Sequence, residues 1–267
     1  MQRQHSPQLE FRIFDSATHP TLDGSWSFNR RGQTFEELAE STRMFPRFRV
    51  LAHGLPNIGK YSHSEYKTRC DDFGFEAIAA LTSTDSGAIT KEVHTIAKLG
   101  YRGLKVHPRL LRSNRNLSYL QEVFRACTET SVVCLLCTYE AHAPGDLPTK
   151  DPYYEICDAL NSSPTTKLIL MHGGVSRIFQ FAGLARHSST VLLDLSFTMM
   201  DRLTQSMSPT LDSLANELDE RICIGSDSPD FSILDFVARA RELLDILPTQ
   251  KASNIASGNL NRFFPEK

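Results

Sequence analysis

The chain has 267 residues, of which 40% are hydrophobic and 22% charged, and its formal net charge is -2. This composition argues against disorder and fits a single globular domain over residues 1–267. The nearly balanced charge excludes a strongly basic nucleic-acid-binding face and adhesion to an anionic membrane, so a small-molecule substrate is the expected partner.

The N-terminal segment Met1–Gln8 lacks the apolar run of a secretory signal, and no later segment is long and apolar enough to span a bilayer. We therefore expect a cytoplasmic protein. The six cysteines show no paired zinc-knuckle spacing. Cys134 and Cys137 match a C-x-x-C pattern, but residues three apart in a strand point to opposite faces, which favours two buried small residues over a redox pair.

Strand-like and helix-like segments alternate along the chain. The predicted strands are Leu9–Phe14, Arg47–Ala52, Phe75–Leu81, Tyr101–His107, Ser131–Thr138, Lys167–His172, Thr190–Leu195 and Arg221–Gly225. Several are continuous apolar runs, as expected of parallel strands that are covered on both faces. The three-four spacing of apolar residues predicts helices between them, including Thr34–Met44, Gly87–Leu99, Leu117–Thr130, Tyr153–Asn161 and Phe231–Leu247.

Eight such units in a chain of this length predict an α/β fold, a distorted (β/α)8 TIM barrel, whose typical size is about 250 residues. The alternative is an open doubly wound sheet, which usually carries a glycine-rich phosphate turn after its first strand. The segment Asp15–Pro20 is no such turn, so the barrel is favoured.

The longer irregular segments each follow a predicted strand, at Pro20–Gln33, His53–His63 and Tyr139–Pro152. In a barrel, loops that follow strands border the active site, so their polar and aromatic residues are candidates for substrate contact. The alternative for each is a solvated loop residue. These candidates are Trp26, Arg30, Arg31, Lys60, Glu140 and His142.

Three ionisable residues stand where predicted strands end. His19 follows the first strand, His172 ends the sixth and Asp227 follows the eighth, so a closed barrel would bring them together. Two imidazoles and a carboxylate could bind one divalent metal, zinc or manganese, that acidifies a bound water. The same groups could also work without metal, with the aspartate as general base and the histidines polarising a carbonyl.

Lys105 and His107 alternate on the fourth predicted strand and therefore share a face. If that face is the interior, both reach the mouth of the barrel, where Arg102 and Arg109 are close in sequence. Such a group could bind a substrate carboxylate or stabilise an oxyanion. The alternative is that Lys105 fills an inner layer by pairing with Asp227 or Asp15.

A family resemblance lies in these same residues. The segments Phe14–His19, Gly100–Pro108, Leu168–Gly174, Leu193–Ser196 and Cys223–Pro229 resemble, in this order, the strand-end motifs of the amidohydrolase superfamily. The closest similarity is to its amidohydrolase-related (amidohydrolase 2) branch of decarboxylases and lactonases. The segment Asn259–Phe264 also resembles the C-terminal helix motif of that branch. The resemblance covers almost the whole chain. It implies a TIM barrel, a substrate-pocket role for Lys105 and His107, and an enzyme that often forms homo-oligomers.

The chain departs from the branch in its ligand set. The branch usually carries His-x-His after the first strand, whereas this chain has Ala17 before Thr18 and His19. On strand five, Cys137 is the residue available where the family usually offers a histidine. If Cys137 points inward, it could join His19, His172 and Asp227 as a metal ligand, since a thiolate binds zinc well. The resemblance also implies a metal-free route, because lactonases acting on pyrone dicarboxylates work without metal.

The leading hypothesis is therefore a lactonase-like hydrolase that cleaves an ester, lactone or amide in a small anionic substrate. Asp227 would be the general base, while His172, His19 and His107 polarise the carbonyl. Lys105, Arg109 and Trp26 would bind the substrate, with the two cations holding its negative end. The variants are a metal-dependent hydrolase, a nonoxidative decarboxylase of the same fold, and an inactive barrel that serves as a binding protein.

Overall fold

The computed structural model describes residues 12–26, 30–45, 47–113, 116–140 and 147–266. Within these residues, eight parallel strands form one sheet in which each strand pairs with the next along the chain. The strands are β1 (Ile13–Thr18), β2 (Phe48–His53), β3 (Glu76–Ala80), β4 (Gly103–Val106), β5 (Val133–Cys137), β6 (Leu168–Met171), β7 (Val191–Asp194) and β8 (Ile222–Cys223). The predicted (β/α)8 barrel is confirmed.

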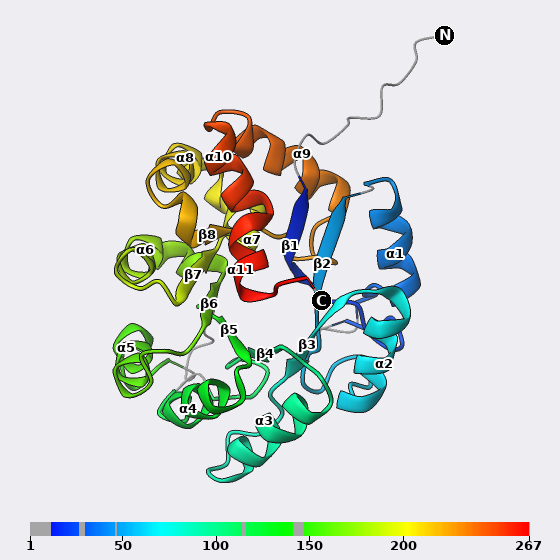
Figure 1. The fold of residues 1–267 in the computed structure, drawn as a ribbon, viewed down its shortest axis with the longest axis vertical. Helices are drawn as coiled ribbons and strands as arrows, with labels where there is room; N and C mark the ends of the chain where they lie inside the picture. The colour runs from blue at the N-terminus through cyan, green and yellow to red at the C-terminus, as the bar shows by residue number, and fades with distance from the viewer. Residues whose placement is uncertain (1–11, 27–29, 46, 114–115, 141–146, 267) are drawn as a thin grey trace.

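Helices surround the ring of strands on the outside (Figure 1). They are α1 (Phe35–Arg43), α2 (His63–Phe73), α3 (Ala88–Lys98), α4 (Leu120–Thr130), α5 (Pro152–Ser162), α6 (Ile178–His187), α7 (Ser196–Met200), α8 (Ser208–Glu217), α9 (Ile233–Leu244), α10 (Thr249–Ser253) and α11 (Asn259–Phe263). Short 3-10 or π turns are η2 (His172–Arg177), η3 (Arg202–Met207), η4 (Asp219–Arg221) and η5 (Asn254–Gly258). Among the described helices, none combines the length and apolar character needed to cross a membrane.

The apolar side chains form two layers, one inside the barrel and one between the strands and the helices. On β5, Val133 and Leu135 lie in the inner layer, while Cys134 and Leu136 lie in the outer one. This follows from the two-residue alternation of side chains along a strand. The same alternation points Cys137 inward, as the sequence analysis required for a role in the site.

The first strand begins and ends later than predicted. The apolar run predicts Leu9–Phe14, whereas β1 runs from Ile13 to Thr18, and residues 9–11 lie outside the described part of the chain. Polar Ser16 and Thr18 are fully buried in this strand. They are tolerated because their hydroxyls donate hydrogen bonds to Asp194 and to the carbonyl of Leu51, respectively.

The barrel closes between β1 and the segment that follows β8. The Ser16 N–H donates to the Ile224 carbonyl at 3.0 Å, and the His19 N–H donates to the Ser228 carbonyl at 2.8 Å. Gly225 is needed at this seam, because a Cβ there would lie 2.8 Å from the backbone nitrogen of Ala17. Closure therefore brings the residues after β1 and β8 side by side, as barrel geometry predicts for His19 and Asp227.

The C-terminal helix α11 covers the end of the barrel opposite to His19 and Asp227. The ring of Phe264 packs 6.5 Å from that of Phe14 in the inner layer, and the Asn259 side-chain amide donates to the Ile222 carbonyl at 2.5 Å. Arg102 also lies at this end, just before β4, where its Nε donates to Glu76 at 2.9 Å. The expectation that Arg102 binds substrate beside Arg109 is therefore wrong, because the strand separates the two arginines.

Candidate active site

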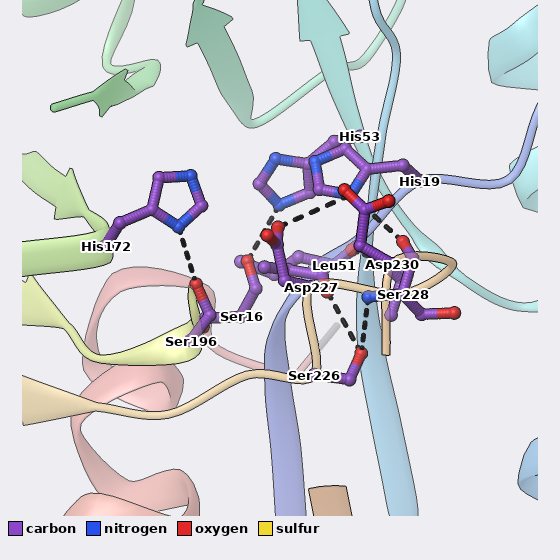
Figure 2. A network of polar contacts seen from close by, with 12 residues as sticks. Ser16, His19, Leu51, His53, His172, Ser196, Ser226, Asp227, Ser228 and Asp230 are labelled. Atoms are coloured by element: carbon purple, nitrogen blue, oxygen red, sulfur yellow. Dashed lines mark hydrogen bonds and ion pairs between the residues drawn. The ribbon is translucent and has the colours of Figure 1, made fainter. Parts of the chain in front are cut away.

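The ends of the strands bring together ionisable side chains that are far apart in the sequence. His19 follows β1, His172 follows β6 and Asp227 follows β8, and all three are buried. In Figure 2, His19 and Asp227 lie on one side of the site and His172 lies across from them. The structure thus places the three residues that the sequence analysis singled out at one end of the barrel.

Asp227 is 7% exposed and has a left-handed backbone with φ of 54°. Its Oδ1 lies 3.8 Å from Nδ1 of His19. Burial raises the pKa of this carboxyl, and the positive charges of His172 and Lys105 only partly oppose that effect. A carboxylate with a raised pKa is a stronger base than a solvated one, which suits it to accept a proton from water.

His172 also has a left-handed backbone, with φ of 65°. Histidine and aspartate are enriched in this region among non-glycine residues, and strained backbone conformations cluster at functional sites. The Nδ1 atom lies 3.1 Å from the Ser196 hydroxyl. Burial lowers the pKa of the ring, but the negative charges of Asp227 and Cys137 raise it by more, so the net shift is upward.

His19 is held in one orientation by the seam of the barrel. Its Nδ1 lies 3.0 Å from the Ser228 carbonyl, which can only accept, so Nδ1 carries a proton. Burial lowers the pKa of His19 well below its usual value, and the charge of Lys105 lowers it further. The ring is therefore neutral, and its Nε2 retains a lone pair.

His53, the last residue of β2, was not among the predicted site residues. Its ring lies 5.2 Å from that of His19, and its Nε2 donates to the Ser16 carbonyl at 2.8 Å. Burial and the charge of Lys105 lower its pKa well below the usual value. Its Nδ1 is buried and has no hydrogen-bond partner among the described residues. Its position directly after a predicted strand, like that of His19, is the signal that could have found it.

Lys105 points into the barrel and is 1% exposed. It lies on β4 between Ala80 of β3 and Leu135 of β5. Its charge acts on His19, His53, His172 and Asp227. Within the described residues its ammonium makes no ion pair of 4.0 Å or less, so the alternative of a close pair with Asp227 or Asp15 is not observed.

Cys137 and His107 complete the wall of the site next to His172. Cys137 is buried at the end of β5. Burial raises the pKa of its thiol, but the charges of His107 and His172 and their hydrogen bonds with the thiol outweigh this effect and bring it well below its usual value. His107 is half-buried, and its Nδ1 accepts the Leu110 N–H at 3.4 Å.

Two of the predicted substrate-binding residues lie at the edge of this group. The Arg109 guanidinium stacks over the ring of Tyr139, 4.6 Å from its centre, and borders a largely apolar pocket. Its Nε is buried without a hydrogen-bond partner in the described structure. The Trp26 ring lies 5.6 Å from that of His19, and its indole N–H donates to Asp230 at 3.2 Å. Their role in substrate binding stays a prediction.

The remaining loop candidates within the described residues each form an ion pair with an oppositely charged side chain. His142 lies outside the described residues. The pairs are Arg30 with Asp230 at 3.0 Å, Arg31 with Glu37, Lys60 with Asp23 at 3.9 Å, and Glu140 with Arg177 at 3.1 Å. Arg31 and Lys60 have side chains that are 80% and 81% exposed, as expected of solvated loop residues.

The arrangement of the possible ligands bears on metal binding. Within the described part of the chain, no group of three or more histidine, cysteine, aspartate or glutamate residues is arranged to hold a metal ion. The Nδ1 atoms of His19 and His172 contact Ser228 and Ser196, so only their Nε2 atoms could bind a metal ion. Both alternatives of the sequence analysis, a site with zinc or manganese and a metal-free site, stay predictions.

The fold and site together define a class. The protein is a (β/α)8 barrel with a buried cluster of histidines, a lysine, a cysteine and a carboxylate at the C-terminal ends of its strands, where barrel enzymes carry their active sites. No protein-family model matches the sequence, and comparison with curated proteins gives no match.

Solved structures are similar to this one over nearly its full length. An uncharacterised TIM-barrel protein from Bordetella bronchiseptica has a TM-score of 0.74 at 13% identity, with 94% of this chain and 98% of that chain covered. A probable 2-pyrone-4,6-dicarboxylic acid hydrolase from Acinetobacter baumannii has a TM-score of 0.69 at 12% identity, covering 96% and 100%. The IDCase of Metarhizium anisopliae has a TM-score of 0.64 at 11% identity, covering 94% and 96%.

Several of these neighbours are TIM barrels of the amidohydrolase superfamily. At such low identities the similarity establishes the fold. It is the fold that the motifs of the sequence lead one to expect.

Proposed function

We propose that this protein is a hydrolase of the amidohydrolase superfamily that cleaves an ester, lactone or amide in a small anionic substrate. The observation that carries the proposal is the burial of Asp227 at the strand ends, where it interacts electrostatically with His172 and Lys105. A carboxylate with a raised pKa opposite two positive groups combines a base with an electrophilic partner in one buried site.

In the reaction, Asp227 takes a proton from water while the water oxygen attacks the substrate carbonyl carbon. The positive charge of His172 stabilises the negative charge that develops on the carbonyl oxygen, while Lys105 holds the substrate carboxylate. When the bond from the carbonyl carbon to the leaving oxygen or nitrogen breaks, the proton held by Asp227 passes to the leaving group. Neutral His19 and His53 hold lone pairs nearby that can orient the water.

The preference for an anionic substrate rests on the unpaired cations. Lys105 is buried without a close ion pair in the described structure, and Arg109 has a buried Nε without a hydrogen-bond partner there. A buried cation without a close partner is unfavourable, and a substrate carboxylate would remove that penalty. The structurally similar Acinetobacter protein, a probable hydrolase of a dicarboxylic acid, has citric acid bound, which supports the same chemistry.

The test is a substrate panel in which each ester, lactone and amide is offered in a form with and a form without a free carboxylate. We expect hydrolysis of carboxylate-bearing members, detected as a rise in mass of one water or as proton release. Preference for the uncharged forms would contradict the assignment of Lys105. Release of carbon dioxide without addition of water would favour the decarboxylase, and binding without turnover would favour an inactive barrel.

The pH dependence of kcat/KM is expected to be bell-shaped. Asp227 must be ionised to act as base, and its pKa is raised by burial, so the rising limb should lie above the ordinary aspartate value of 3.8. His172 must be charged to polarise the carbonyl, and its pKa is raised, so the falling limb should lie above 6.5. Because Asp227 and His172 interact, the apparent pKa values of the two limbs describe the pair and not either residue alone. Activity that keeps rising into the alkaline range would contradict the role of charged His172.

Metal content gives an independent prediction. Because the described ligands do not converge on three-fold coordination, we expect protein purified without chelators to contain zinc and manganese well below one equivalent. Elemental analysis of the wild-type protein and of a His172→Ala variant checks this. A full equivalent of either metal that disappears in the variant would instead assign His172 as a ligand.

A further inference from the structure

A buried hydrogen-bond network connects His172 to the end of β7. The carboxylate of Asp194 is fully buried and accepts on both oxygens. Oδ2 accepts the His172 N–H at 2.9 Å and the Ser196 hydroxyl at 2.6 Å. Oδ1 accepts the Ser196 N–H at 3.2 Å and the Ser16 hydroxyl. One carboxylate therefore joins Ser16 within β1 to the residues that follow β6 and β7.

These contacts determine where the Ser196 proton lies. A hydroxyl has one proton to donate, and the short contact with Asp194 uses it. The Ser196 oxygen can then only accept from Nδ1 of His172, 3.1 Å away (Figure 2). It follows that Nδ1 of His172 carries a proton, whether the ring is neutral or charged, and that the other nitrogen, Nε2, is the one that gains and loses protons.

We propose that Ser196 and Asp194 are positioning residues that keep a proton on Nδ1 of His172 and leave Nε2 as its reactive nitrogen. The proposal rests on the proposed function of His172 and deepens it, because it specifies the atom that faces substrate. The segment Leu193–Ser196 carries one of the motifs of the chain, and the mechanism above gives it no role. In functional histidines, the hydrogen bond made by one ring nitrogen commonly determines which of the two nitrogens carries the proton.

The network also fixes the histidine backbone. The carbonyl of His172 accepts the Thr198 hydroxyl, while its N–H donates to Asp194. Both backbone polar groups are thus satisfied by side chains at or just after the end of β7, in a residue whose φ of 65° lies outside regular structure. The ring and the backbone of His172 are oriented by the same short stretch of chain.

The tautomer can be measured without any substrate. Nitrogen-15 NMR of protein labelled at histidine, with His172 assigned by its absence in a His172→Gln variant, reports which ring nitrogen is protonated. At a pH where the ring is neutral, we expect the proton on Nδ1 in the wild type and in Ser196→Thr, which keeps the hydroxyl. In Ser196→Ala the proton should move to a mixture of the two nitrogens.

A wild-type ring protonated on Nε2, or an unchanged Ser196→Ala spectrum, would overturn the proposal. If Ser196→Ala fails to fold, the wild-type and Ser196→Thr spectra still decide. Ser213→Ala, on the exposed side of α8, is the matched control and should leave the signal of His172 unchanged.

Turnover provides the second measurement. With a substrate in hand, Ser196→Ala should lower kcat about tenfold with little change in KM, and Ser196→Thr should restore most of it. Failure to find a substrate would affect the proposed hydrolysis and leave the NMR result standing. An expected tautomer shift with no change in kcat would show that the network exists but does not serve turnover.

Discussion

Replacing Asp227 with asparagine is expected to lower kcat about 10³-fold, because a general base contributes on that order and the amide cannot accept the water proton. Asparagine has nearly the same size and tolerates the left-handed backbone at this position, where φ is 54°. The fold and substrate binding should therefore persist. Steady-state kinetics together with the melting temperature and substrate affinity check the result.

The control for this variant is Asp158→Asn, which makes the same chemical change on the exposed surface of α5. It should retain wild-type kcat. If Asp227→Asn keeps more than a tenth of the activity, water activation must come from another group, and the neutral histidines His19 and His53 would be the first to examine.

The second large effect concerns stability. Asp15 is fully buried, and its Oδ2 has no hydrogen-bond partner among the described residues, whereas Oδ1 accepts the N–H groups of Ala17 and Ser226. Burial raises the pKa of Asp15 from 3.8 to about 7. The unfolded chain therefore loses this proton first as pH rises. Stability from this group is complete below 3.8 and is lost as pH increases to about 7.

Asp15→Asn should remove this pH dependence, since an amide can keep the Oδ1 contacts and carries no charge. The shift of about three pKa units corresponds to about 4 kcal/mol at most. Relative to the wild type, we expect the variant to gain about 2.5 kcal/mol in unfolding free energy between about pH 5 and about pH 8. Urea unfolding at both pH values measures it.

Asp158→Asn again serves as the control and should show no such gain. An Asp15→Asn variant with the same pH dependence as the wild type would mean that Asp15 is ionised and compensated in the folded protein. A variant that loses stability equally at both pH values would point instead to unfavourable placement of the new amide next to Gly225.

The strands show how much of the fold the local sequence pattern predicts. Buried apolar runs such as Val133–Cys137 and Leu168–Met171 were located within a few residues, because a parallel strand covered on both faces must be apolar along its length. The first strand was misplaced because Ser16 and Thr18 break that pattern. Their hydroxyls are satisfied by Asp194 and Leu51, on strands distant in sequence, so no local rule predicts their burial.

The site shows the same division. His19, His172 and Asp227 were predictable because strand ends converge in any closed barrel, whatever the details of packing. His53 obeys the same rule and opens the segment His53–His63 that the sequence analysis placed beside the active site, but it was not singled out as a strand-end residue. The expectation for Arg102 was wrong because β4 begins at Gly103, two residues later than predicted, so that Arg102 precedes the strand and lies at the opposite end of the barrel from Arg109. A boundary error of that size is common in sequence-based assignment.

The sequence by itself determined the alternation of strands and helices, the barrel, and the three ionisable residues at strand ends, since these depend on periodicity and chain order. Only the tertiary structure decided the pKa shifts and the hydrogen-bond partners of the site residues. The raised pKa of Asp227, the lowered pKa of His53 and the contact between Nδ1 of His172 and Ser196 depend on burial and on partners such as Lys105 that other strands supply. Those distances and degrees of burial arise only when the barrel closes.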